Sequence, residues 1–247
     1  MPSRLDDLLN TAVTIPSARV RSYVDDIRTK NPQASPEQIL AILHRRYLLA
    51  VGGSGGAVGA VAAVPALGTG AALLITSGQV AAFLGASGVL ALGVADVHGI
   101  DVEDVPRRKA VLLTALLGPK GPELLQEQIG VTSVTWGRAL MTRVPLGTVK
   151  AVNRTLRKRV IATSTAKAGS IMLGRLLPFG VGAVVGYTGG RVMGKSMIRG
   201  IDSAFGPPPM EFTREIGATP KLITQPAPRA LGTARAPGPG ADEPGLR

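Results

Sequence analysis

The pattern of apolar and polar positions predicts helices along most of the chain. Residues 1–34 carry apolar side chains at helical spacing and form two short amphipathic helices with polar breaks. A new helix is then predicted to begin, with Ser35 as its N-cap and Pro36 in the first helical position. Gln38 occupies the capping-box position of the same helix.

A long uncharged stretch follows and dominates the sequence. No charged residue occurs in 47–95. One helix of that length would extend for about 70 Å, far beyond the thickness of a bilayer core. Pro65 and Gly68 break the stretch near its middle, which predicts two apolar helices at 47–64 and 69–95 joined as a hairpin. Each helix is close to the ~20 residues needed to cross hydrocarbon.

The residues that flank this hairpin are compatible with insertion in a membrane. Arg45-Arg46 precede it and Arg107-Arg108-Lys109 follow it, so both ends would stay on the cytoplasmic side. Glycine and alanine, however, contribute little free energy to the transfer of a helix from water into hydrocarbon. Two interpretations therefore stay open: a hairpin inserted in lipid, and a soluble bundle that buries the same helices.

Shorter helices are predicted after the hairpin. Gly99 suits the position just beyond the end of the second apolar helix. The acidic residues of 101–104 form the first turn of a helix that reaches Leu117. A further short helix covers 122–130.

Residues 146–164 have the pattern of a basic amphipathic helix. The apolar stripe consists of Val149, Val152, Leu156 and Val160. The candidate lipid-headgroup residues on another face are Lys150, Arg154, Arg157 and Lys158.

Glycines at every fourth position mark a later apolar helix, predicted over 179–199. They are Gly182, Gly186, Gly190 and Gly194, and Gly52 and Gly56 form a similar stripe in the first apolar helix. Each glycine inside a helix costs about 1 kcal/mol relative to alanine. Repetition of this cost on one face indicates close helix packing, either within one bundle or in a homo-oligomer.

Composition changes again near the C-terminus. Residues 206–247 are rich in Pro, Gly and Ala and are predicted to form a disordered tail. The predicted organisation is therefore N-terminal amphipathic helices at 1–34, an all-helical domain at 35–205 and this tail.

Charge is distributed unevenly. The net charge is +12, and residues 128–201 contain no Asp or Glu. This one-sided block implies an anionic partner: phospholipid headgroups, nucleic acid or an acidic protein. For the basic helix itself, lipid binding and a merely solvated face both stay open. Nucleic acid is disfavoured because residues 143–167 contain no aromatic side chain for base stacking. The polar, acidic N-terminus predicts no secretion signal.

Signals for chemistry are few. There is no Cys, which excludes thiolate nucleophiles and Cys-based metal sites. Residues 189–196 match the phosphate-binding pattern G-x-x-x-x-G-K-[ST] through Gly189, Gly194, Lys195 and Ser196. A true phosphate loop follows a strand, and here the preceding residues favour a helix. We predict no catalytic residue, metal site or cofactor.

The order of these parts resembles the EcsC-type protein family of bacteria, over roughly residues 36–206. The resemblance is carried by Pro-Ala-Leu-Gly at 65–68, by Val-Ala-Asp-Val-His-Gly at 94–99 with Arg-Arg-Lys-Ala-Val-Leu-Leu at 107–113, and by the glycine-rich 176–186 with Ala204-Phe205. It implies an all-helical, membrane-associated protein, and it supplies no catalytic residues.

These observations together predict an all-α helical bundle without enzymatic activity, associated with the cytoplasmic side of the cell membrane. Its partners would be anionic lipids, a second copy of the chain or a membrane protein. The alternative is a soluble cytoplasmic interaction module. A nucleotide-binding protein that uses residues 189–196 is the third hypothesis.

Overall fold

The described part of the chain is all-α, as predicted, with turns and no strand between its helices. The computed structural model describes residues 2–62, 69–118, 120–130, 136–174 and 181–217. These ranges contain nine helices: α1 (Pro2–Val13), α2 (Ser17–Lys30), α3 (Pro36–Ala62), α4 (Thr69–Val97), α5 (Val105–Leu116), α6 (Lys120–Ile129), α7 (Trp136–Thr142), α8 (Leu146–Gly174) and α9 (Val181–Phe205).

The predicted capping box is present at the start of α3. The Gln38 N–H donates to Ser35 Oγ at 3.3 Å, and the Ser35 N–H donates to Gln38 Oε1 at 2.9 Å. The helix then continues to Ala62 without interruption. The polar helix that begins here and the first apolar helix are thus one helix, because no breaker separates them.

The end of α4 also follows the prediction. Gly99 has φ +67°, and its N–H donates to the Asp96 carbonyl at 2.9 Å. The Ile100 N–H donates to the Ala95 carbonyl, also at 2.9 Å. A left-handed residue with these hydrogen bonds is the usual way for a helix to end at glycine.

The acidic residues after Gly99 do not form a first helical turn, so that prediction was wrong. Asp101 instead forms an ion pair with Arg21 of α2 at 3.1 Å. The Val102 carbonyl accepts hydrogen bonds from Ser17 and Arg108. These tertiary contacts hold the segment outside a helix, and α5 begins only at Val105.

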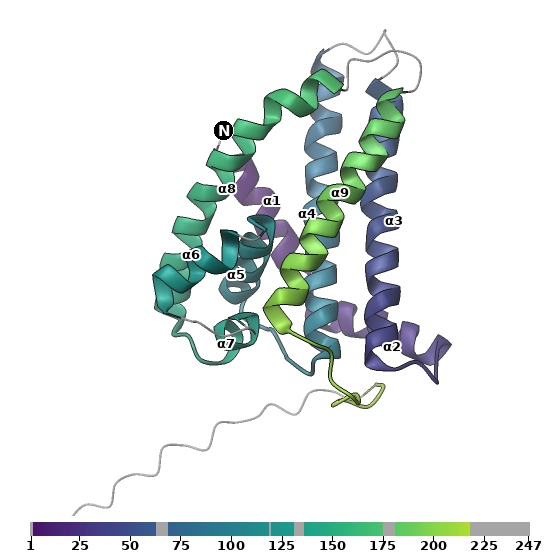
Figure 1. Cartoon of the computed structure of the whole chain (residues 1–247), viewed down its shortest axis with the longest axis vertical. Coiled ribbons are helices and arrows are strands. Elements are labelled where there is room, and N and C mark those ends of the chain that lie inside the picture. The colour runs from purple at the N-terminus through teal and green to yellow at the C-terminus, as the bar shows by residue number, and fades with distance from the viewer. Residues whose placement is uncertain (1, 63–68, 119, 131–135, 175–180, 218–247) are drawn as a thin grey trace, which may run out of the picture.

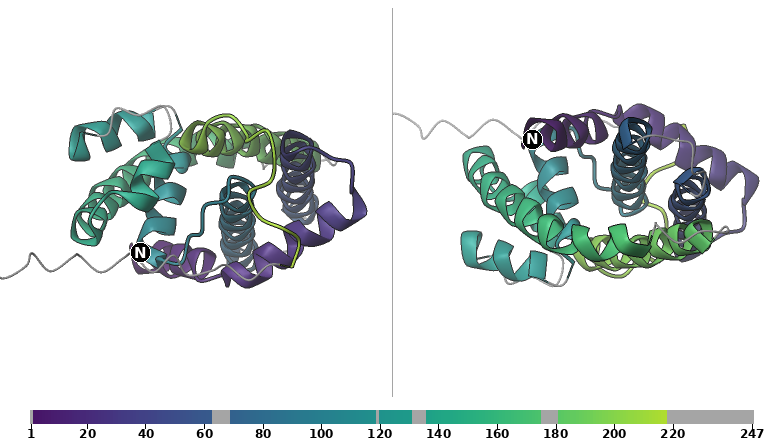
Figure 2. Two further views of the ribbon diagram at one scale, coloured as in Figure 1. Left: turned by 90° about the horizontal axis from the view of Figure 1, so that it is seen from below. Right: turned by 90° about the horizontal axis from the view of Figure 1, so that it is seen from above.

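Four long helices determine the shape of the molecule. Helices α3, α4 and α9 run side by side along the long axis, while α8 leans away from them (Figure 1). Helix α4 lies between α9 on one side and α1 and α2 on the other (Figure 2). Its C-terminal half is therefore covered on several sides.

The C-terminal ends of α3 and α8 lie at the same end of the molecule as the N-terminal ends of α4 and α9 (Figure 1). We call this end the apex and define it as residues 47–62, 69–83, 163–174 and 181–194. The rest of the described chain is the base.

The base holds most of the hydrophobic core. Its fully buried side chains include Ile39, Leu112, Leu156 and Phe205. Leu9 of α1 and Ile27 of α2 are equally buried and belong to the same cluster. The N-terminal helices thus share a core with the residues predicted as a separate helical domain.

The chain after α9 does not become disordered at residue 206. Residues 206–217 cross the base as a strap that we define by this range. Arg214 in the strap contacts Asp25 of α2 and Asp96 of α4. Prolines and glycines exclude a helix there but not ordered contacts. The remainder of the predicted tail, 218–247, lies outside the described residues.

Candidate functional site

The four long helices keep their acidic residues at the base. Glu37 lies in the first turn of α3, Asp96 at the end of α4 and Asp202 near the end of α9. Helix α8 has no acidic residue. The apex therefore contains no Asp or Glu in its helices, and Lys167 and Arg191 are its cations.

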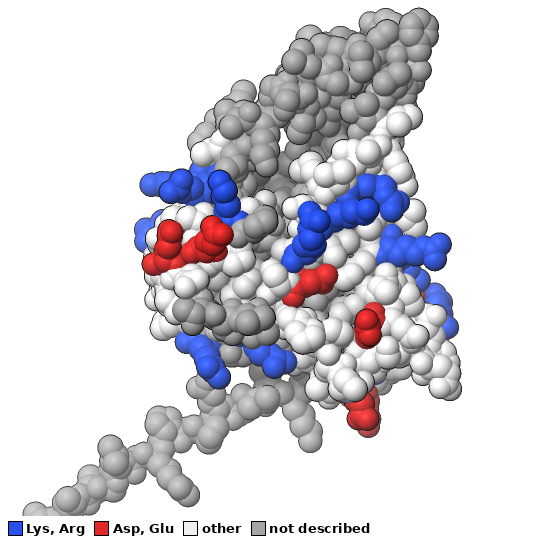
Figure 3. Space-filling model, in the orientation of Figure 1, with Lys and Arg blue, Asp and Glu red and all other residues white. Residues whose placement is uncertain are grey.

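The surface reflects this distribution. On the face shown in Figure 3, the highest Lys and Arg side chains lie near the middle of the molecule, and others lie further down. The acidic side chains on this face lie at the middle and toward the base, and the described surface above the highest cations on the side of α3 carries no charge (Figure 3). Along the long axis of the molecule, charged surface thus gives way to uncharged surface toward the apex.

Apolar side chains are exposed along the apex. Val184 is 66% exposed on α9, and Leu49 is 52% exposed on α3. Further exposed apolar residues of the apex are Val80, Tyr187, Val192 and Met193. Large exposed apolar residues near one end of a molecule are typical of an interaction surface.

One helical stretch among the described residues, Gly78–Val97 of α4, has the length and apolar composition to cross a membrane. It is 56% buried inside the bundle, which is equally typical of a core helix in a soluble protein. Leu84, Leu90 and Val94 are buried in the base. This fold therefore holds the C-terminal half of α4 within the base.

The glycine stripes bring α3 and α9 together as an antiparallel pair. A Cβ on Gly186 would overlap the Gly55 carbonyl, and a Cβ on Gly190 would lie 2.5 Å from the Val51 carbonyl oxygen. On Gly194 it would lie 2.9 Å from side-chain atoms of Leu48 and Val51.

The other glycines of the predicted stripes are less informative. A Cβ on Gly52 would meet the side chains of Tyr187 and Arg191. The Gly56 nitrogen lies 3.6 Å from the position of a Cβ on Gly186. The surroundings of Gly182 lie outside the described residues. We call the α3–α9 contact the glycine seam.

A buried hydrogen-bond chain lies at the lower end of the seam. The Tyr47 hydroxyl lies 2.8 Å from Ser87 Oγ, and the Ser87 hydroxyl donates to the Phe83 carbonyl at 2.7 Å. Since Ser87 uses its proton on Phe83, Tyr47 is the donor to Ser87. Burial raises the pKa of Tyr47 to about 12.

The basic amphipathic helix is present as the N-terminal part of α8. Val149, Val152, Leu156 and Val160 are buried, in agreement with the apolar stripe. Lys150, Arg154 and Lys158 are exposed, whereas Arg157 is half-buried. Three of the four headgroup candidates are therefore accessible to an anionic partner.

A second basic row lies on α9 and was not singled out from the sequence. Tyr187, Arg191, Lys195 and Arg199 follow one another at every fourth position. The Arg191 guanidinium donates to the Tyr187 hydroxyl at 2.9 Å and lies 5.6 Å from the ring centroid. In the sequence this row alternates with the glycine stripe, and the phosphate-loop pattern includes its Lys195.

The phosphate-loop pattern does not form a loop. Residues 189–196 lie inside α9, between Val181 and Phe205. Amide groups within a helix are bonded to carbonyls one turn earlier, so they cannot cradle a phosphate. Gly189, Lys195 and Ser196 thus lie on a continuous helix, without the loop that nucleotide binding through this motif requires.

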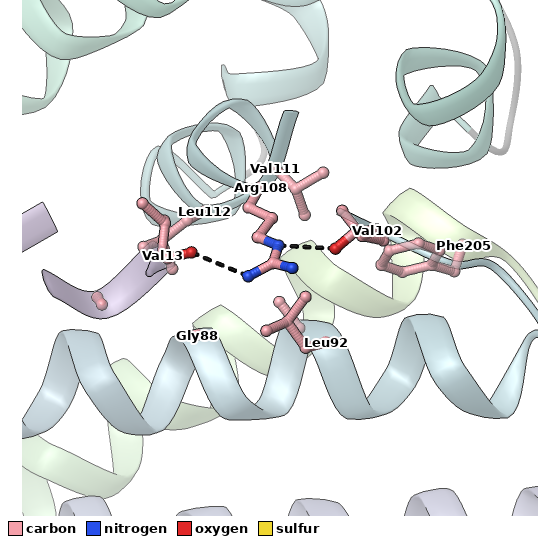
Figure 4. A pocket seen from close by; sticks show the side chains of 10 residues that line it. Val13, Gly88, Leu92, Val102, Arg108, Val111, Leu112 and Phe205 are labelled. Atoms are coloured by element: carbon pink, nitrogen blue, oxygen red, sulfur yellow. Dashed lines mark hydrogen bonds between the residues drawn. The ribbon is translucent and has the colours of Figure 1, made fainter. Parts of the chain in front are cut away.

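The cavity in the base is lined by apolar residues and one arginine (Figure 4). Its interior leaves room for no more than about one water molecule. Arg108 is 9% exposed and donates to the Val102, Val13 and Ile15 carbonyls and to the Ser17 hydroxyl. Burial lowers the pKa of Arg108. These contacts join the α1–α2 connection to the start of α5, which is a structural role.

The strap is held by a half-buried cluster of charges. Arg214 Nη2 lies 2.7 Å from Asp25 Oδ1 and 3.0 Å from Asp96 Oδ2. Burial alone would raise the pKa of Asp25, but hydrogen bonds from Arg214 and the Gly217 N–H outweigh it, and the pKa lies below 3.8. For Asp96 burial prevails over Arg214, and its pKa is raised.

No group of three His, Asp or Glu side chains that could hold a metal occurs in the part of the chain that the structure describes. Comparison of the chain with protein-family models, with curated proteins and with solved structures gave no match.

Proposed function

We propose that this protein is a non-enzymatic peripheral membrane protein that binds a bilayer through its apex. The observation that carries the proposal is the charge polarity of the four long helices, which places uncharged and apolar surface at one end. A bilayer has a matching profile, because hydrocarbon lies beyond a layer of charged headgroups. The resemblance to the EcsC-type family implies the same association and stays a prediction.

The mode of binding that this fold supports is shallow. From Tyr47 to Ala62, α3 extends for about 24 Å without a charge, which is less than the hydrocarbon thickness. The C-terminal half of α4 is held in the core of the base. Crossing the bilayer would require this half to leave the core, whereas entry of the apex into one leaflet would not.

Vesicle flotation with substituted full-length chains tests this proposal. Leu49→Glu combined with Val184→Glu places two charges on the exposed apolar surface of the apex. We expect at least a tenfold loss of binding to vesicles. Met210→Glu is the matched control, since Met210 is 94% exposed in the strap at the base and its replacement should leave binding unchanged.

Equal binding by the apex variant and the control would overturn the proposal. Far-UV circular dichroism and thermal melts of both variants should match the native chain, because the substituted positions are exposed. A change confined to vesicle binding would then reflect the surface and not the fold.

The second candidate function is a soluble helical interaction module, favoured by the burial of α4 within the bundle. It predicts that the native chain is monodisperse in light scattering without detergent and does not float with vesicles. That pair of results would replace the membrane proposal.

A further inference from the structure

A row of cations lies beside the glycine seam and runs from Arg191, at the lower edge of the apex, into the base. The packing of α9 against α3 fixes the position of these cations along the long axis. Arg191 packs against Gly52, and Asp202 lies 3.2 Å from His44. Arg191, Lys195 and Arg199 therefore lie along the length of α3 from 44 to 52, which is about 12 Å. Arg45 and Arg46 of α3 lie within the same interval.

Among the described residues, the three cations of α9 have no acidic partner at their own level. Asp202 lies at the lower edge of the interval, and it faces His44. No ion pair is formed by Arg191, Lys195 or Arg199 within the described residues. Like charges four residues apart on a helix repel each other. The row thus retains an unfavourable interaction that an external anion would relieve.

Their position coincides with the boundary between charged and apolar surface. Above Arg191 the described part of α9 has no charge, and Val184 is exposed there. Tyr187 lies one turn above Arg191 with a half-exposed ring, which suits the border between hydrocarbon and headgroups. Its hydroxyl accepts from Arg191 and still has a proton to donate to an anionic oxygen.

We propose that Tyr187, Arg191, Lys195 and Arg199 form a binding row for the phosphate groups of anionic lipids. This inference rests on the proposed membrane function and names the chemistry of the surface that is bound. Arginine and tyrosine donors suit phosphate oxygens, and lysine adds an unspecific positive charge. The apex supplies apolar contact, while the row selects negatively charged bilayers.

The test compares vesicles of phosphatidylcholine alone with vesicles that also contain phosphatidylglycerol. The variant carries Arg191→Gln, Lys195→Gln and Arg199→Gln. Basic residues close to an anionic membrane each contribute about 1 kcal/mol, so we expect a roughly 100-fold loss of affinity for the anionic vesicles. Binding to the neutral vesicles should not change.

Two control variants test whether the position of the row and its positive charge are needed for binding, apart from any effect on folding. Arg19→Gln, Lys120→Gln and Arg143→Gln remove the same number of charges at exposed positions away from the row, and should weaken anionic binding less than about fivefold. Arg191→Lys with Arg199→Lys keeps the charge and should retain most of the binding.

The outcomes distinguish this inference from the function on which it rests. Equal losses in the two triple variants, or no loss in either, would overturn the row while leaving the apex proposal intact. Failure of the native chain to bind any vesicle would overturn both. Without vesicles, a thermal shift by inorganic phosphate that only the row variant loses would identify free phosphate as the ligand and overturn the lipid assignment.

Discussion

At the scale of single residues, Tyr47 links the seam to α4 through one directed hydrogen bond. The tyrosine hydroxyl donates to Ser87, and loss of the tyrosine proton removes that donor and leaves a buried negative charge. The ordinary pKa of tyrosine is about 10, so the folded state disfavours ionisation by about two pH units.

This difference predicts alkaline sensitivity. Since the pKa of Tyr47 is raised in the fold, its stabilisation is complete below pH 10 and is lost as the pH rises to about 12. The loss is about 2–3 kcal/mol. Urea unfolding between pH 9 and pH 11.5 should show it in the native chain but not in Tyr47→Phe. Equal slopes for the two chains would contradict this assignment.

Single residues were predictable where the signal is local. Ser35, Gln38 and Gly99 act within four residues of the groups they bond, and their roles followed from spacing alone. Arg108 did not, because its acceptor Val13 lies 95 positions away in the sequence. The row on α9 was missed for another reason: its spacing is visible, but its acid-free surroundings depend on which helix faces it.

At the scale of elements, the seam explains why α9 tolerates so many glycines. Gly190 and Gly189 are neighbours on one helix but face different surroundings. A Cβ on Gly190 would meet the Val51 backbone, whereas a Cβ on Gly189 would have nothing within 4 Å. The two positions therefore separate packing from helix propensity.

Alanine at these two glycines should change stability in opposite directions. Gly190→Ala forces α3 and α9 apart and should lower the free energy of unfolding by about 2 kcal/mol. Gly189→Ala should raise it by up to about 1 kcal/mol, because alanine favours the helix and meets no obstacle. Chemical denaturation of both variants measures this. A stabilised Gly190→Ala would mean that the seam is not tightly packed.

The helices themselves were mostly predictable, and their ends were not. The extension of α8 to Gly174 and of α9 to Phe205 exceeds the amphipathic pattern, since packing continues where the periodicity fades. Helix α7 was not predicted. It is only seven residues long and is fixed by tertiary contacts, with Trp136 buried and a Cβ on Gly137 only 2.7 Å from Ala204.

At the scale of the whole molecule, the strap closes the base and joins the C-terminal part of the chain to α2 and α4. Composition alone indicated a disordered tail from residue 206. The half-buried charges Asp25, Asp96 and Arg214 are far apart in sequence, so nothing local marked the ordered part. The uncharged hairpin was visible in the sequence, but not that half of α4 forms the centre of the base.

Removal of the strap cation should destabilise the fold most at neutral pH. In Arg214→Gln, the half-buried Asp25 and Asp96 lose their main partner, and we expect a loss on the order of 1–3 kcal/mol. Arg214 lowers the pKa of Asp25 in the fold, so the stabilisation from Asp25 is present above the pKa of the unfolded chain and is lost as the pH falls through the folded pKa.

The raised pKa of Asp96 has the opposite effect. Because this carboxyl ionises less readily in the fold than in the unfolded chain, its contribution to the free energy of unfolding falls as the pH rises. Asp25, whose pKa is lowered, is charged at pH 7 and loses its main partner in the variant, so the substitution should cost more there than at low pH. Urea unfolding at pH 7 and at pH 3 measures the difference. An equal loss at both values would exclude the charge cluster as its cause.

The glycine seam also has a consequence for synthesis of the chain. Helix α3 ends at Ala62 and its partner α9 begins at Val181, so about 120 residues are translated before the seam can close. At ordinary elongation rates this takes roughly 6–24 s. During that interval the glycine face of α3 and the apolar side of α4 emerge from the ribosome without their final cover. The nascent chain thus presents its most apolar surface well before it can fold, and that is the period in which a chaperone or a membrane would meet it.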